Sequence, residues 1–248
     1  MSEIFKEFDT YGRRAQLYPA LLTFLPLAAA IVLLWPGLEL EKLGTCAVAL
    51  GVPFFLMNIV RGRGQRLEGK LVRQWAGMPT THLLRNSTTG GNRVLRDRRR
   101  AALEKLVGGP LPTLHEERVL PSASDERYTA ATRVLITRVR EQSDRYPLVR
   151  EELTKYGFWR NLLALRPIAF IVLAGALTTD GVAFLAGRDP QVVGVAALIH
   201  VCFLLSFLLA VSPKRVFQQG ETYAERLFET LETIGSHAPA GGGGHKED

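Results

Sequence analysis

Asp180 and His200 are the only acidic or basic side chains within four long apolar stretches of the sequence. At 1.5 Å per helical residue, each lies roughly 9 to 12 Å from the short turn that joins their two stretches. Antiparallel helices would therefore place them side by side. Ionisable groups are costly in a bilayer and usually face a bundle interior or water. The pair predicts either a polar element of a pore or protonation-sensitive lock, or a structural hydrogen bond to which Thr178 and Thr179 contribute.

Arginines crowd one short stretch in the polar middle of the chain. A guanidinium group binds phosphate in a bidentate manner. The stretch has no aromatic side chains of the kind that recognise RNA by stacking. We therefore expect anionic lipid headgroups or a small anionic ligand here, and not nucleic acid. The arginines are Arg93, Arg96, Arg98, Arg99 and Arg100.

A glycine- and proline-containing turn precedes Thr80 and Thr81, and Arg73 and Arg85 flank it. Hydroxyl and backbone N–H groups at a helix start can bind an anion. The same residues would also serve as an ordinary helix cap. The spacing of a phosphate-binding P-loop is absent. The sequence is compatible both with an anion-binding site and with an ordinary helix cap.

Aromatic and basic side chains also come just before the third apolar stretch. Trp159 and Arg160 have the composition of an anchor at the membrane interface. Gly157 costs about 1 kcal/mol inside a helix, which predicts a hinge between a cytosolic domain and the membrane.

The sequence shows no arrangement typical of catalysis or metal binding. Both cysteines, Cys46 and Cys202, lie in apolar stretches, and no Cys-x-x-Cys pair or Cys/His zinc spacing occurs. No serine–histidine–acid set or carboxylate cluster can be assembled by spacing. We therefore expect a protein that is not an enzyme and has no metal or cofactor.

The four apolar stretches predict the fold class. Each is close to the ~20 residues that a helix needs to cross a bilayer. The mean hydropathy of the whole chain is only +0.07, because a polar middle separates them. We expect an all-α integral membrane protein with two transmembrane hairpins and a helical cytosolic domain inserted between them. The stretches are Leu17–Pro36, Leu43–Val60, Pro167–Ala186 and Val192–Val211.

Charge predicts the orientation. Residues 61–164 carry 21 Lys and Arg against 11 Asp and Glu, whereas each short turn within a hairpin has one basic residue. Basic flanks stay in the cytoplasm. The prediction is a multi-pass protein of the inner (cytoplasmic) membrane with both termini in the cytoplasm.

The polar segments read as amphipathic helices. Residues 122–146 and 218–234 have apolar side chains at three- and four-residue spacing, and residues 94–107 predict a strongly basic helix. Ser122 and Asp125 resemble a capping box that opens the first of these helices, and the stretch between residue 108 and Pro121 reads as a loop. Pro147 suits the first turn of a further helix.

These patterns together give an expected organisation. It consists of a cytoplasmic amphipathic helix (1–16), a first transmembrane hairpin (17–60), a basic helical cytoplasmic domain (61–164), a second hairpin (165–211), a further cytoplasmic amphipathic helix (212–235) and a disordered tail (236–248).

The layout is similar to that of the small four-span effectors of bacterial antiphage defence systems, which disrupt the inner membrane on a signal. The similarity lies in the arrangement of spans and carries over no site residues. We expect a homo-oligomer, surrounded by membrane lipids, whose cytosolic domain senses an anionic small molecule or a soluble protein and alters bundle packing or permeability. The alternative is a membrane anchor or scaffold for a separately encoded soluble partner.

Overall fold

The computed structural model describes residues 11–34, 52–89 and 91–235, and every regular element within them is a helix. Three helical segments are long and apolar enough to cross a membrane: Arg13–Leu34, Pro147–Leu185 and Pro190–Leu209. They match the first, third and fourth predicted spans. The all-helical class is confirmed, and apolar helices of this length indicate a membrane-associated protein.

Three predictions fall wholly or partly outside the described residues. The second predicted span, Leu43–Val60, is described only from Val52, where a helix begins that continues to Gln74. The first ten residues and the tail from residue 236 are likewise not described. Four spans and two hairpins therefore remain a prediction.

The chain divides into two compact units. Residues Met1–Gln74 and Leu153–Gln219 form the first, here called the apolar unit, and Trp75–Glu152 with Gly220–Asp248 form the second, the polar unit. By sequence, the apolar unit carries 15 Lys and Arg against 8 Asp and Glu, and the polar unit carries 16 of each. The net charge of +7 therefore belongs to the apolar unit, because basic and acidic residues balance in the polar unit.

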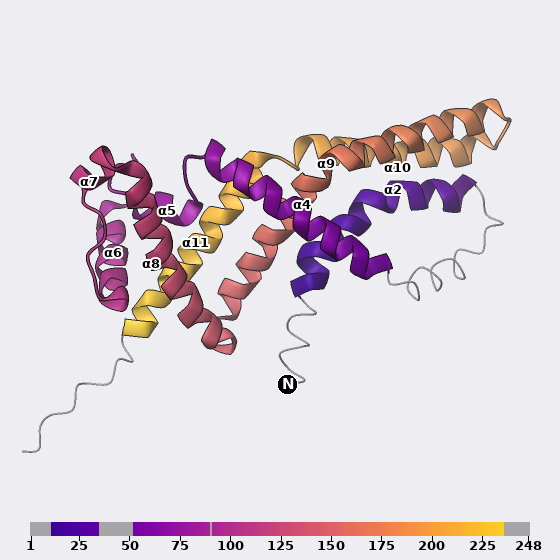
Figure 1. Ribbon diagram of the computed structural model, residues 1–248. Coiled ribbons are helices and arrows are strands. Elements are labelled where there is room, and N and C mark those ends of the chain that lie inside the picture. The colour runs from indigo at the N-terminus through magenta and orange to yellow at the C-terminus, as the bar shows by residue number, and fades with distance from the viewer. Residues whose placement is uncertain (1–10, 35–51, 90, 236–248) are drawn as a thin grey trace, which may run out of the picture. The chain divides into compact units, whose positions relative to one another are not determined.

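The elements of the apolar unit begin with a π-helical turn, η1 (Arg13–Leu17), which leads into α2 (Tyr18–Leu34). They continue with α4 (Val52–Gln74), the part of α9 (Pro147–Leu185) that follows residue 152, α10 (Pro190–Leu209) and the first residues of α11 (Pro213–Gly235). In Figure 1, α2 lies alongside the hairpin of α9 and α10. Gly187, with φ of 75°, supplies the left-handed residue that the hairpin turn needs.

Each of these three helices buries one narrow stripe. Along α9 the buried residues follow three- and four-residue spacing and include small side chains, which let helices approach closely in a membrane. Large apolar side chains cover the remaining faces, with Ile171 73% and Leu198 64% exposed. Water-soluble proteins rarely leave such continuous apolar surfaces open. The stripe of α9 is Ala169, Leu173, Ala176, Asp180 and Ala183.

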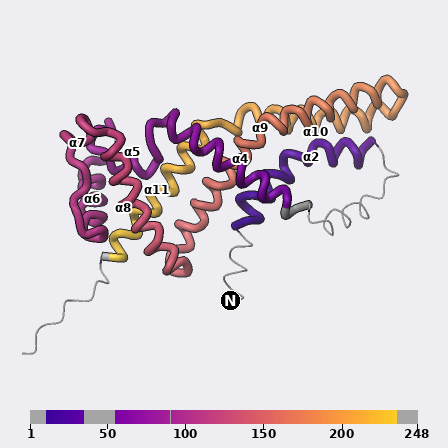
Figure 2. Tube along the Cα trace, in the orientation of Figure 1, coloured from indigo at the N-terminus to yellow at the C-terminus, as the bar shows by residue number. Residues whose placement is uncertain are grey.

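The polar unit contains α5 (Pro79–Leu84), α6 (Arg93–Val107), α7 (Leu114–Val119), α8 (Pro121–Glu141), the 3-10 turn η2 (Ser143–Arg145) and the outer ends of α9 and α11. The tube in Figure 2 traces their order along the chain. The two predicted apolar stripes, on α8 and α11, meet in one core. That core includes Leu103, Tyr128, Ala131, Leu135, Val139, Leu227, Phe228 and Leu231.

Two predictions about the helices of the polar unit were wrong. The stretch before Pro121 is not all loop, because the Thr113 side chain and Glu116 form a capping box that opens α7. The helix α8 begins at Pro121 without a side-chain cap and ends at Glu141, so Ser122 and Asp125 are not its capping box. The start of α9 at Pro147 is confirmed.

Candidate functional site

The most unusual polar group in the apolar unit is a junction of three helices at His200. The imidazole Nδ1 of His200, on α10, lies 2.6 Å from Oδ2 of Asp180 on α9. Its Nε2 lies 2.9 Å from the carbonyl oxygen of Pro26 on α2. His200 is fully buried and Asp180 is 3% exposed. The contact between Asp180 and His200 follows from their similar predicted depths, whereas the third partner had no signal in the sequence.

Hydrogen-bond chemistry fixes the number of protons at this junction. A carbonyl oxygen can only accept, so Nε2 of His200 carries a proton and donates it to Pro26. The bond between Nδ1 and Asp180 then needs one further proton, which lies on either partner. The pair is electrically neutral in both cases. Losing or gaining a proton would leave a net charge among apolar side chains, which is costly.

One oxygen of the junction lacks a partner. Oδ1 of Asp180 is buried and accepts no hydrogen bond within the described residues. The predicted help from two threonines is wrong, because Thr178 and Thr179 bond back to the carbonyls of Ala174 and Gly175 on their own helix. The junction therefore keeps one buried acceptor without a hydrogen bond, which is costly among apolar side chains.

Three of the predicted anion-binding arginines donate hydrogen bonds to other groups of the polar unit. Arg100 donates to the carbonyls of Leu84 and Pro112 and to the Tyr128 hydroxyl. Arg96 donates to the carbonyls of Arg85 and Thr88. Arg85 itself forms a bidentate ion pair with Asp125 and also reaches the Ala76 carbonyl. These side chains hold loops in place, and within the described residues Nε of Arg96 is buried without a hydrogen-bond partner.

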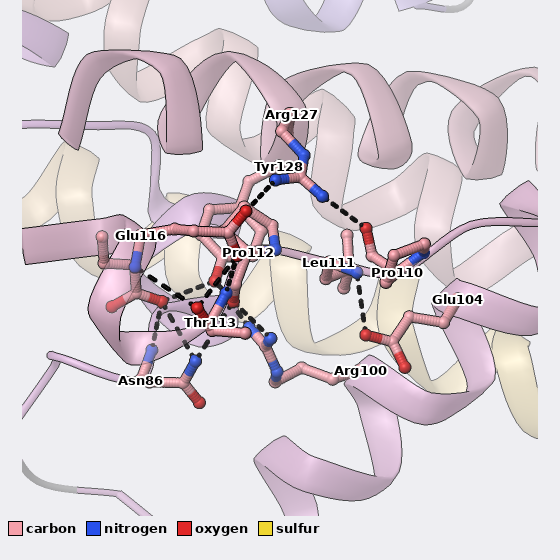
Figure 3. A network of polar contacts seen from close by, with 11 residues as sticks. Asn86, Arg100, Glu104, Pro110, Leu111, Pro112, Thr113, Glu116, Arg127 and Tyr128 are labelled. Carbon is pink, nitrogen blue, oxygen red and sulfur yellow. Dashed lines mark hydrogen bonds and ion pairs between the residues drawn. The ribbon is translucent and has the colours of Figure 1, made fainter. Parts of the chain in front are cut away.

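Figure 3 shows the network around Arg100, between α6, α7 and α8. Glu117 is its acidic centre and is 7% exposed. It accepts from the Tyr128 hydroxyl at 2.5 Å and from the backbone N–H groups of Asn86 and Ser87 at 2.8 Å each. Burial alone would raise the pKa of Glu117, but these hydrogen bonds outweigh it and the pKa is lowered. A buried carboxylate thus organises the loop before α6.

The other predicted residues of the arginine group fall at different places. Arg93 is exposed and lies 3.8 Å from Asp97 of the same helix. Arg98 and Arg99 line a groove on the polar unit. Thr80 and Thr81 are buried in α5, and no side chain caps that helix. Arg73 belongs to α4 in the apolar unit.

The predicted anchor residues lie in a second polar cluster of the apolar unit. Glu68 on α4 accepts from the Tyr156 hydroxyl at 2.7 Å and from Arg160 at 2.9 Å. Asn161 donates to the Ala15 carbonyl at 2.6 Å. The partners are distant in sequence, so the pattern around each gave no signal for the cluster.

The helix α9 runs unbroken through Gly157. A Cβ atom at that position would lie 3.0 Å from the Tyr11 hydroxyl and 3.1 Å from Cβ of Ala15. Close packing therefore gives one reason for glycine there. The ring of Trp159 faces the guanidinium group of Arg215 at 4.9 Å, a cation–π contact that fixes its position.

Within the described residues, no group of three or more His, Cys, Asp or Glu side chains could hold a metal ion. No protein-family model matches the sequence, and neither curated proteins nor solved structures give a significant match.

Proposed function

We propose that this chain is a non-enzymatic, oligomeric protein of the bacterial inner membrane. Its polar unit binds an anionic ligand or a protein partner, and this binding changes the packing or permeability of the apolar helices. The observation that carries the proposal is the junction of Asp180, His200 and the Pro26 carbonyl. It is buried and neutral, it joins three helices, and it has one unpartnered oxygen.

The size of the interaction suits a switch. Hydrogen bonds between membrane helices contribute roughly 0.6 to 2 kcal/mol each. Losing one or two would shift an equilibrium between two packings by roughly tenfold without abolishing the fold. The small side chains along the stripe of α9 would maintain contact between the helices in either state.

The proposal includes a topology. The apolar unit has an excess of Lys and Arg over Asp and Glu, and basic residues beside membrane spans stay in the cytoplasm. With four spans, both termini and the polar unit would therefore lie in the cytoplasm. A cysteine introduced at exposed Ser122 would then be protected from a membrane-impermeant maleimide in intact cells and would react after lysis. Reaction in intact cells would overturn this orientation.

The scaffold alternative meets one obstacle. Residues 218–234, which would offer a partner their apolar face, bury Leu227 and Leu231 in the core of the polar unit. A scaffold would therefore have to use another surface of that unit. Co-purification of a stoichiometric soluble protein would favour it.

The test compares two junction variants with two controls in cells that overproduce the protein. Asp180→Asn and His200→Ala alter the junction, whereas Thr178→Val and Ser206→Ala remove hydroxyls that bond only to their own helices. Entry of a membrane-impermeant dye reports permeability, and size in detergent reports assembly.

We expect the natural chain to admit the dye. We expect the junction variants to change the rate of entry with assembly intact, and the controls to behave as the natural chain. Loss of assembly in both junction variants would instead show that the hydrogen bond between Asp180 and His200 serves to hold the fold together. A natural chain that never admits the dye would contradict a role in permeability.

A further inference from the structure

A groove on the polar unit combines an apolar floor with a basic rim. It lies between α6, α8 and α11 and has a volume of about 960 Å³, near the upper end of the range for small-molecule sites. Its floor is formed by the partly exposed side chains of Leu95, Ala102, Leu106 and Ile234, and the core residues Phe228 and Leu231 lie almost fully buried beneath them. The rim carries Arg98, Arg99, Lys105, Arg138 and Arg145, together with Glu229 and Glu232.

The rim is basic because of where the charged residues lie in the fold, and not because the polar unit has an excess of basic residues. The polar unit as a whole has equal numbers of basic and acidic residues, but the rim has five cations against two carboxylates. Glu229 pairs with Arg226 outside the groove at 2.8 Å, and Glu232 lies 3.6 Å from Arg98. Among the described residues, neither Arg99 nor Lys105 has an ion-pair partner. Arg99 lies over the Phe228 ring at 6.0 Å and Arg138 lies 3.7 Å from Glu141, so the basic charge of the rim is only partly offset by carboxylates of the protein.

We propose that this groove binds an anionic phospholipid, with the headgroup phosphate against the basic rim and an acyl chain along the apolar floor. The lysine and arginine side chains supply the donors that phosphate accepts. An apolar floor beside them fits a ligand with two chemical ends. The assignment gives a chemical class to the ligand of the proposed function and in that respect rests on it.

Two observations favour a lipid over other anions. The chain carries apolar helices long enough to cross a membrane, and a chain inserted in a membrane meets anionic lipids at high local concentration. A nucleotide or nucleic acid would use the rim but would leave the apolar floor without a partner. The apolar floor is what distinguishes the candidates.

The experiment measures binding to the full chain in nanodiscs made only of zwitterionic lipid. Three probes are added: dioctanoylphosphatidylglycerol, dioctanoylphosphatidylcholine and glycerol 3-phosphate. We expect saturable binding of the first alone, because it has both the charge and the chains. Equal binding of phosphatidylcholine would overturn the role of the rim, and equal binding of glycerol 3-phosphate would overturn the role of the floor. Tighter binding of an acidic amphipathic peptide would identify a protein-docking surface and overturn the lipid assignment.

Charge-reversal variants inside and outside the groove test whether the lipid binds there. Lys105→Glu combined with Arg138→Glu should weaken binding about tenfold or more, since each basic residue near an anionic lipid contributes about 1 kcal/mol. Arg118→Glu combined with Arg133→Glu makes the same change of charge in the polar unit away from the groove, and we expect little effect. Equal weakening by both pairs would show a diffuse charge effect and contradict the site.

A second pair tests the floor. Ala101 is exposed and lines the groove, so Ala101→Trp should obstruct it without entering the core. Val94, on the same helix, is 77% exposed and lies outside the groove, so Val94→Trp should leave binding unchanged. These binding measurements do not involve permeability. The lipid assignment and the proposed function can therefore fail independently of each other.

Discussion

The two units of this protein use polar contacts in opposite ways. In the polar unit a single carboxylate, Glu117, accepts four hydrogen bonds and holds a loop against the first turns of α8. In the apolar unit the buried Asp180 has one partner and an unpartnered oxygen. The Glu117 carboxylate uses both of its oxygens in hydrogen bonds, whereas the Asp180 carboxylate uses only one where three apolar helices meet. We therefore expect a change at the junction to alter helix packing and a change at Glu117 to destabilise the polar unit.

The largest effect should follow from Glu117→Ala. It leaves the backbone N–H groups of Asn86 and Ser87 without their acceptor, while the Tyr128 hydroxyl keeps the Pro112 carbonyl, and each lost hydrogen bond to a charged group costs about 1.5 to 3 kcal/mol. We expect a loss of about 3 kcal/mol or more in the stability of the polar unit, measured by thermal unfolding in detergent. The neighbouring Glu116→Ala removes an exposed capping box and should cost much less. Equal losses would remove the distinction between buried and surface carboxylates.

A packing change in the apolar unit should have the next largest effect. A Cβ atom at Gly64 would lie 1.9 Å from Oδ1 of Asn161, whose amide donates to the Ala15 carbonyl. Gly64→Ala should destabilise the unit by about 1 to 3 kcal/mol through overpacking. Gly62→Ala, on the same helix with nothing within 4 Å, is the matched control and should not destabilise. Unchanged unfolding of the Gly64 variant would mean that α4 and α9 do not approach this closely.

Acid should reduce the stability of the polar unit by a smaller amount. The pKa of Glu117 is lowered from its ordinary value of 4.5, so its contribution is present above that pH and is lost as pH falls through the folded pKa. The loss is at most about 1.4 kcal/mol per pH unit for one group. Thermal unfolding between about pH 5 and pH 3 should show a steeper decline for the natural chain than for Glu117→Gln. Parallel declines would assign the acid sensitivity to other groups.

The sequence predicts features with local or periodic signals. The stripes on α8 and α11 have helical spacing, and the depths of Asp180 and His200 follow from counting residues, so their burial and contact could be predicted. The capping box of Thr113 lay hidden in a stretch with three prolines. The inward direction of Arg96 and Arg100 depends on carbonyls of loops that fold back, and the contact of Tyr156 with Glu68 joins residues far apart in the chain. Contacts of this kind have no period to detect.

The central claim is that hydrocarbon surrounds the outer faces of α2, α9 and α10. Cys202 lies exposed on α10 and provides a probe in the natural chain. In a Cys46→Ser variant it is the single thiol, and sealed liposomes can be treated with a membrane-impermeant maleimide. We predict that Cys202 stays unmodified until the vesicles are dissolved in denaturing detergent, whereas a cysteine at Ser122 in liposomes that expose the polar unit reacts at once. Rapid modification of Cys202 in intact vesicles would show that water reaches this face and would contradict the account.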